Sequence, residues 1–429
     1  MTIFFNDVKA PVLCQAQISI LFKRMISSIV HQILNFIYDM RNFPPRLLLP
    51  VSLTMVAIII QGCQPEVNTQ TQHAPNVPQA QPEQSSPITI STSSSADYDG
   101  YLSIRNAPER DLYKIASRLK PNSKKFIVKI TATPPPAKLG DKQIFPLFNA
   151  TSNDKYNITA ALKFITPNSY WYFEQNTSID PVKLEETAKT FEEHILPTIV
   201  ATFGSIWPLG ATGNLRVTIL HAPLSGNIGY YTSINEHPVE VHESSVERKV
   251  IYLNSVDLKL GSPEYHAILS HELQHMIHWN HDPSEESWVN EGLSELAADI
   301  AGFPNKQIAR FSSDPSTQLN AWNHNPKAAA YHYGASYLFF RYLLDRYITV
   351  DDIKTLVKEP ADGIPGLETA LGKLGLNISF NEIFGRWIIA NLINSETISE
   401  LGYNQNTTAR QSFKKISPQK LIKTFGQLF

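Results

Sequence analysis

The chain of 429 residues is almost free of cysteine and contains only Cys14 and Cys63. We expect translation to start at Met40, with Met25 as the alternative, because residues 1–39 are an apolar and aromatic mixture without caps or turns. Residues 1–39 would then be a gene-model extension, which leaves Cys63 as the one cysteine of the mature protein. A fold held together by disulfides is therefore not expected, although an oxidising location stays compatible with the sequence.

The chain also lacks an excess of charge of either sign. The 37 Lys and Arg residues nearly balance the 39 Asp and Glu residues, which gives a formal net charge of −2 at pH 7, and the basic residues are scattered. A concentrated basic surface that would attract nucleic acid or an anionic membrane is therefore not expected. The composition predicts that nucleic acid is not a partner.

The apolar stretch at 47–60 is too short for a comfortable membrane span and has the length of a signal-peptide core. It ends in the letters I-Q-G-C at 60–63, which resemble a bacterial lipobox. Residues 40–63 are therefore predicted to be a lipoprotein signal peptide, with the lipid on Cys63. An ordinary secretory signal or an uncleaved anchor is the alternative.

Residues 64–97 have almost no apolar bulk and are rich in Gln, Pro, Ser and Thr. Such a segment buries too little surface to offset its chain entropy, so we predict a disordered linker that holds a globular part away from the membrane. Gln64 stands where an inner-membrane retention signal would have Asp. The sequence thus predicts export to a bacterial cell envelope with lipid anchoring, in the outer membrane where there is one.

The motif H-E-L-Q-H at 271–275 is the most informative part of the chain. On an α-helix, positions i and i+4 lie one turn apart on the same face, so the imidazoles of His271 and His275 can reach one metal ion. Glu272 lies in the same turn, close enough to take a proton from a water at the open position of the metal. The positions around the motif are uncharged, as expected of a helix buried around a dry site. This pattern is typical of zinc hydrolases.

A catalytic zinc ion usually has three protein ligands, and the third is open at this point. His281 has the spacing of the third metzincin histidine, but His278 stands where that pattern has glycine, and no methionine lies further downstream for a methionine turn. Glu291 and Glu295 are the other candidates. They lie four residues apart on one face of a helix predicted at 290–299.

The segment W-V-N-E-G-L-S-E at 288–295 resembles the gluzincins. Thermolysin-like members carry N-E-x-x-S-D after H-E-x-x-H, and the leukotriene-hydrolase and aminopeptidase group carries W-L-N-E-G. The nearest resemblance is to the hyicolysin-type peptidases, over residues 215–350. It implies that Glu291 is the third zinc ligand and that Glu295 orients His271 from behind. The gap between the two motifs is shorter here than in either group.

Hydrolysis through a tetrahedral intermediate needs a hydrogen-bond donor opposite the metal. In the aminopeptidase group, the catalytic tyrosine stands in Y-x-x-G at the start of a helix. By that match Tyr331 is the oxyanion donor and Gly334 the glycine, with Tyr333 and His332 as fallback donors. The alternative is that these aromatic side chains only pack the helix start.

Residues 98–180 are predicted to be a β-rich N-terminal region, and residues 181–429 the zinc metallopeptidase domain. Asp180-Pro181 predicts a helix start, and Pro197 is expected to end or kink that helix near residue 196. Gly229–Ser233 is a candidate edge strand that would pair with extended substrate. The predicted strands are 126–132, 160–165, 170–173, 215–220 and 250–254; the predicted helices after 263 include 351–358, 365–375 and 380–394.

These patterns and the resemblance predict an α+β, zincin-like metallopeptidase of two lobes, with a mixed sheet in the N-terminal lobe, helices in the C-terminal lobe and the active-site helix between them. The expected function is that of a zinc-dependent endopeptidase that hydrolyses protein or peptide substrates through a metal-activated water, with Glu272 as general base and Zn²⁺ as cofactor. An aminopeptidase of the same clan is the nearest alternative, for which only Glu236 offers an acidic anchor. A catalytically silent, lipid-anchored binding protein is the other, and the intact Glu272 disfavours it.

Overall fold

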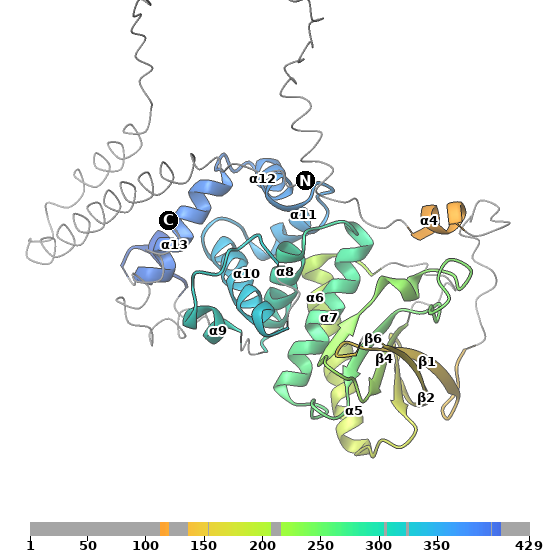
Figure 1. Ribbon diagram of the computed structural model, residues 1–429. Helices are drawn as coiled ribbons and strands as arrows, with labels where there is room; N and C mark the ends of the chain where they lie inside the picture. The colour runs from red at the N-terminus through yellow and green to blue at the C-terminus, as the bar shows by residue number, and fades with distance from the viewer. Residues whose placement is uncertain are drawn as a thin grey trace, which may run out of the picture. The chain divides into compact units, whose positions relative to one another are not determined.

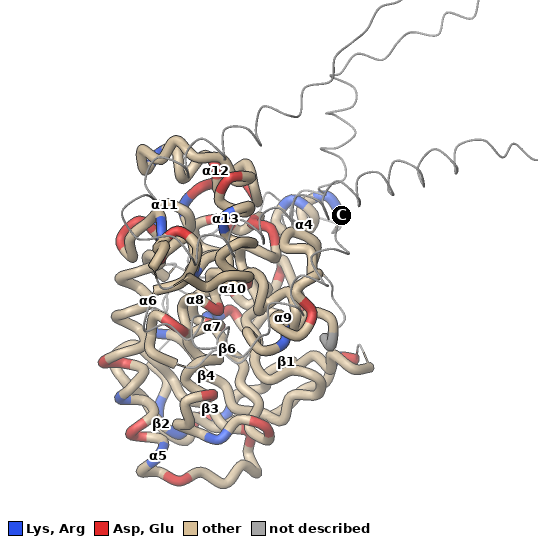
Figure 2. Tube along the Cα trace, turned by 90° about the vertical axis from the view of Figure 1, so that its left-hand side faces the viewer, with Lys and Arg blue, Asp and Glu red and all other residues tan. Residues whose placement is uncertain are grey.

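The structure is a computed structural model that describes residues 112–119, 136–152, 154–206, 216–303, 307–322, 326–395 and 397–404. All of them belong to one compact unit, Pro108–Leu428. The predicted extension, signal peptide, lipid-bearing Cys63 and linker lie outside the described residues, as does the strand predicted at 126–132. No helix in these described ranges combines the length and apolarity of a membrane span. In Figure 2, acidic and basic positions are interspersed along the described trace.

A six-stranded mixed sheet has the order β1-β2-β3-β4-β6-β5 (Figure 1). Its strands are β1 Lys142–Asn149, β2 Asp154–Ile165, β3 Ser169–Glu174, β4 Val217–Ala222, β5 Gly229–Tyr231 and β6 Val250–Asn254. Strands β3, β4 and β6 run parallel, and the other pairs are antiparallel. The strands predicted at 160–165, 170–173 and 250–254 are confirmed as parts of β2, β3 and β6, and the strand predicted at 215–220 overlaps β4, which begins at Val217. Because β3 pairs with β4, strands before and after residue 180 belong to one sheet.

Apolar side chains cover both faces of the sheet, since successive residues of a strand point to opposite sides. Trp171 of β3 and Ile219 of β4 lie in the larger core, together with the helices. Their neighbours Tyr172 and Leu220 lie in a smaller core, where they meet Phe145 of the edge strand β1. The sheet curls around this smaller core, because β1 and β6 both contribute to it although three strands separate them.

The helical segment after Asp180 is longer than predicted. It consists of α5 Pro181–Thr190, the π-helical turn η1 Phe191–Ile195 and α6 Leu196–Phe203. The side chain of Asp180 accepts from the backbone N–H of Val182 at 2.9 Å, which is the predicted N-cap. Helical structure continues past Pro197 to Phe203, so the expectation that the helix ends there is wrong, and the alternative of a kink stays a prediction. Pro197 lies in the first turn of α6, where the preceding π-turn has already interrupted the regular ladder, so its missing N–H does little harm.

Helices make up most of the chain after β6, as predicted, and the α+β class is confirmed. The helices expected at 290–299, 351–358, 365–375 and 380–394 are found within a few residues of those bounds, whereas α9 was not predicted. The described helices outside the α5–α6 segment are α4 Leu112–Leu119, η2 Ser233–Glu236, α7 Pro263–His281, α8 Ser287–Ile300, α9 Ile308–Ser313, α10 Pro326–Arg346, η3 Val350–Asp352, α11 Ile353–Val357, α12 Gly363–Lys373, α13 Phe380–Ile393 and η4 Ser399–Leu401.

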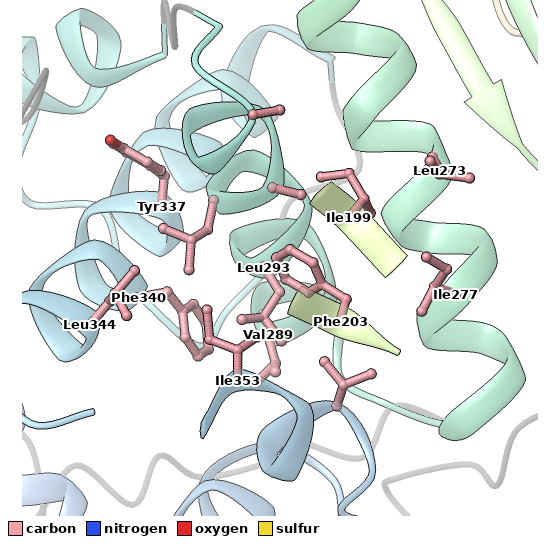
Figure 3. Packing of buried hydrophobic residues seen from close by; sticks show 14 of the residues in the cluster. Ile199, Phe203, Leu273, Ile277, Val289, Leu293, Tyr337, Phe340, Leu344 and Ile353 are labelled. Atoms are coloured by element: carbon pink, nitrogen blue, oxygen red, sulfur yellow. The ribbon is translucent and has the colours of Figure 1, made fainter. Parts of the chain in front are cut away.

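Helix α8 packs against both α7 and α10. Figure 3 shows Val289 and Leu293 of α8 in the apolar core between Phe340 of α10 and Phe203 of α6. Glycine is needed at Gly292, because a Cβ atom there would lie 2.6 Å from Cδ2 of Phe340. This close contact with α10 fixes the rotation of α8 about its axis, and so determines which of its side chains face α7.

Candidate metal centre

Helix α7 presents His271 and His275 from adjacent turns. The helix starts at an N-cap, where the Ser262 hydroxyl accepts from the backbone N–H of Tyr265 at 3.2 Å. Its residues around the H-E-x-x-H motif are almost all buried, as the uncharged sequence predicted. The two histidine Nε2 atoms lie 2.9 Å apart. The spacing of the motif therefore brings both imidazole nitrogens to one point.

Glu291 of α8 completes this group. Its Oε2 atom lies 3.1 Å from His271 Nε2 and 3.2 Å from His275 Nε2. A tetrahedral zinc ion with bonds of about 2.0–2.1 Å holds its ligands about 3.4 Å apart. The three distances in the structure are close to this value, and two imidazoles with one carboxylate are a donor set that zinc accepts. The residues present therefore fit the ion that the sequence implies.

The far nitrogens of both imidazoles also have partners. Nδ1 of His271 lies 3.3 Å from Oε1 of Glu295, where the resemblance placed an orienting carboxylate. Nδ1 of His275 donates to the side-chain oxygen of Asn290, and Ser294 Oγ lies 3.0 Å from the same nitrogen. Partners on Nδ1 fix the ring orientation and leave Nε2 for a metal. The sequence interpretation gave Asn290 and Ser294 no role, although N-E-x-x-S contained both.

The charges at this site are strongly coupled. Burial alone would raise the pKa of Glu291, but His275 and His271 outweigh it and lower that pKa. Burial alone would lower the pKa of His271, but its contacts with Glu291 and Glu295 raise it well above its usual value. Carboxylates thus surround the two imidazoles closely enough to stabilise positive charge between them. A bound cation would be stabilised at the same place.

Glu272 lies beside this group and is buried, with 6% of its surface exposed. Its carboxylate accepts from the backbone N–H of Tyr231, the last residue of β5. Burial raises the pKa of Glu272, and the two motif histidines oppose the shift only in part. A carboxylate with a raised pKa is a stronger base than an exposed one, which suits an acceptor of protons near neutral pH.

The tyrosine next to the ligand cluster is Tyr333, not Tyr331. The ring centroids of Tyr333 and His271 are 6.0 Å apart, and the Tyr333 side chain hydrogen bonds to Glu291. Among the described side chains, no ring contact or hydrogen bond joins Tyr331 to the cluster. The reason is that α10 already begins at Pro326, so these two residues project about 200° apart around a regular helix. Tyr333 is further held by Trp322, at 5.0 Å between ring centroids.

Three other candidates lie elsewhere. His281, at the end of α7, is outside the cluster and packs over Gly204, where an added Cβ atom would be 2.6 Å from its Nε2. His332, the other fallback donor, packs against Trp322. Glu236 is 5% exposed and interacts electrostatically with buried Lys249; burial raises the pKa of Glu236 to about 7.

The predicted edge strand is present in shorter form. β5 pairs with β6 and stands last in the sheet order, which makes it an edge of the described sheet. The chain turns into η2 at Ser233, so strand structure ends at Tyr231 rather than at the predicted residue 233. Gly229 lets β5 approach α7, because a Cβ atom there would lie 2.6 Å from Cγ2 of Ile268. The edge strand therefore runs beside the helix that carries the motif.

A scan against protein-family models and a search of curated proteins find no match to this chain. Its function is therefore inferred from its own residues: the two motifs, the positions of α7 and α8, and the convergence of three donor atoms.

Proposed function

We propose that the chain is a zinc-dependent endopeptidase with a zincin-like, gluzincin-type arrangement of two lobes, the sheet on one side of α7 and the helices α8 to α13 on the other. The single observation that carries the proposal is the convergence of His271 Nε2, His275 Nε2 and Glu291 Oε2 within 3.2 Å of one another. The adjacent carboxylate of Glu272 supports a hydrolytic role rather than a purely structural one.

The three side chains would hold zinc, and Glu295 and Asn290 would keep the imidazoles oriented through Nδ1. When bound, zinc supplies Lewis acidity toward water and the peptide carbonyl. The Glu272 carboxylate accepts a proton from the attacking water and then passes it to the leaving amine. The Tyr333 hydroxyl is the proposed donor to the developing oxyanion, because it is the tyrosine beside the cluster.

Two features favour an endopeptidase over an aminopeptidase. Strand β5 is last in the described sheet, so its outer edge would offer backbone groups to an extended peptide chain, and Tyr231 links this strand to Glu272. An aminopeptidase needs an available acidic group for the substrate amine. Glu236 is a poor anchor for this purpose, since it is buried and Lys249 already interacts with it.

The test uses casein as substrate for the purified chain, with and without a zinc chelator. We expect cleavage that the chelator abolishes and added zinc restores. Glu272→Gln should abolish cleavage and keep the bound zinc, because the substitution preserves shape and removes the base. Cleavage that survives in this variant would refute the proposed role of Glu272. Zinc binding without cleavage in the unaltered chain would instead indicate a catalytically silent binding protein.

We also propose that the protein is exported and anchored through a lipid on Cys63. The support is the I-Q-G-C segment and the Gln-, Pro- and Ser-rich stretch that follows it. Metabolic labelling with a radioactive fatty acid should mark the wild-type protein in a bacterial host but not the Cys63→Ser variant. Equal labelling of both would exclude this anchor.

A further inference from the structure

A second group of metal-binding side chains lies where α7 ends. His278, Asp282 and Glu285 each offer one donor atom, and these atoms lie within 4.8 Å of one another. None of the three belongs to the proposed catalytic cluster. We propose that they form a second, structural site for a divalent transition-metal cation such as zinc. This inference does not depend on the proposed peptidase activity.

Two buried metal-binding atoms in this group have no hydrogen-bond partner among the described residues. His278 is fully buried, its Nδ1 lies 3.3 Å from Nε2 of Gln274, and its own Nε2 has no hydrogen-bond partner among the described residues. Ligation through Nε2 places the ring proton on Nδ1, so the Gln274 amide would turn its oxygen toward that nitrogen. Asp282 is 3% exposed; its Oδ1 accepts from the backbone N–H and hydroxyl of Ser284, whereas its Oδ2 likewise has no described partner. An unpaired buried polar atom costs about 1–3 kcal/mol. A cation would satisfy both atoms at once.

Several acidic side chains crowd around this group. Oε1 of Glu285 accepts from the backbone N–H groups of Glu286 at 2.6 Å and Gly363 at 2.8 Å, which leaves Oε2 for another partner. Burial, with Asp282 and Asp362 nearby, raises the pKa of Glu285 to about 8. Burial also raises the pKa of Asp282. The carboxylates of Asp282, Glu285 and Asp362 thus lie close enough to repel one another, and a cation placed among them would offset that repulsion.

The donor set identifies the class of cation. Calcium and magnesium take oxygen ligands almost exclusively, whereas zinc combines imidazole with carboxylate oxygen. The imidazole of His278 therefore favours a transition metal. Three protein donors leave room for one water in a four-coordinate site.

The position of the group gives it a structural role. Asp282 caps the C-terminus of α7, and Glu285 lies two residues before α8 begins at Ser287. An ion here would join the end of α7 to the start of α8, and through Gly363 to the start of α12. It would thereby fix the short connection that lets Glu291 reach the histidines. A hydrogen-bond path from His278 through Gln274 and Ser294 to His275 also links the two sites.

The experiment removes the first site and asks whether zinc still binds. The full chain carrying His271→Ala and His275→Ala is stripped of metal, and zinc is titrated by equilibrium dialysis with elemental analysis. We expect one tightly bound zinc in this variant and two in the wild-type chain. No tight zinc in the double variant would overturn the proposal, and this comparison leaves the second group unaltered.

Assignment of the ligands uses a further substitution in the same background. Asp282→Asn should weaken zinc binding at least ~100-fold, since loss of a ligand costs more than the 10–100-fold typical of groups behind a ligand. The matched control is Asp362→Asn, whose carboxylate shares the Ser284 hydroxyl with Asp282 but belongs to none of the three donors; here the loss should stay within the ~10–100-fold typical of a group behind a ligand. Equal losses in both variants would contradict ligation by Asp282. Millimolar calcium should not displace the zinc, and displacement would refute the transition-metal class.

Discussion

Replacement of Glu291 by Gln is the perturbation with the most specific outcome. The side chain keeps its shape, so the packing of α8 on α7 and α10 should persist, but the charge at Oε2 is lost. That oxygen lies 3.1 and 3.2 Å from the two histidine nitrogens, where a direct ligand of the proposed zinc ion would lie. Groups one step behind a ligand typically contribute 10–100-fold to metal affinity. Loss of the ligand itself should therefore exceed ~100-fold, or about 2.8 kcal/mol of binding free energy.

The matched control is Glu295→Gln, four residues along the same helix. Its carboxylate lies 3.3 Å from Nδ1 of His271, the nitrogen that faces away from the other ligands, so we expect a loss of only about 10–100-fold. The assay is competition for zinc against a chromophoric chelator at pH 7.5. A larger loss in Glu295→Gln than in Glu291→Gln would refute the assignment of the third ligand. Circular dichroism would verify that both variants keep the wild-type helix content.

Three further predictions concern the groups around the site and the core. Tyr333→Phe should lower the rate of casein cleavage by about 10²–10³-fold with zinc content unchanged, while the control Tyr331→Phe stays near wild type; the reverse ranking would restore Tyr331 as donor. Burial lowers the pKa of His221 from 6.5 to about 4. The contribution of neutral His221 to the free energy of unfolding is therefore fully present above pH 6.5, and about 3 kcal/mol of it is lost as the pH falls from 6.5 through 4. Urea denaturation across pH 4–7 should show this loss, and His221→Gln should make the slope less steep, with the remainder due to other buried histidines such as His266; an unchanged slope would contradict the assignment. Gly292→Ala should destabilise the fold by about 1–3 kcal/mol in the same assay, because its Cβ atom would clash with Phe340, and an unaffected midpoint would contradict the tight packing of α8 on α10.

The parts that sequence reasoning predicted well depend on local periodicity. The H-E-x-x-H spacing could only bring His271 and His275 together if the segment was helical, and the uncharged flanks indicated that α7 is buried. The position of Glu291 could not be predicted from helical spacing alone, since its distance from the two histidines depends on how α8 packs against α7. The motif supplied that information indirectly: Gly292 is the residue that permits close packing on α10, and Asn290 and Ser294 are the groups that contact His275.

The parts that it missed depend on tertiary structure. Strand β1 contains Pro146 and alternates only weakly, but pairing with β2 stabilises it at the edge of the sheet. The choice between Tyr331 and Tyr333 depended on where α10 begins. The residue at which a helix begins is harder to predict from sequence than the presence of the helix. The group at His278 was not recognised, because Asp282 and Glu285 looked like ordinary polar residues of a loop. The burial of Asp282 and the partial burial of Glu285 distinguish them.

The most direct test of the central claim is a crystal structure of the zinc-loaded chain with anomalous diffraction recorded at the zinc edge. We predict an anomalous peak bonded to His271 Nε2, His275 Nε2 and Glu291 Oε2 at about 2.0–2.2 Å. A peak that is absent from this position, or one that lacks Glu291 as a ligand, would contradict the account.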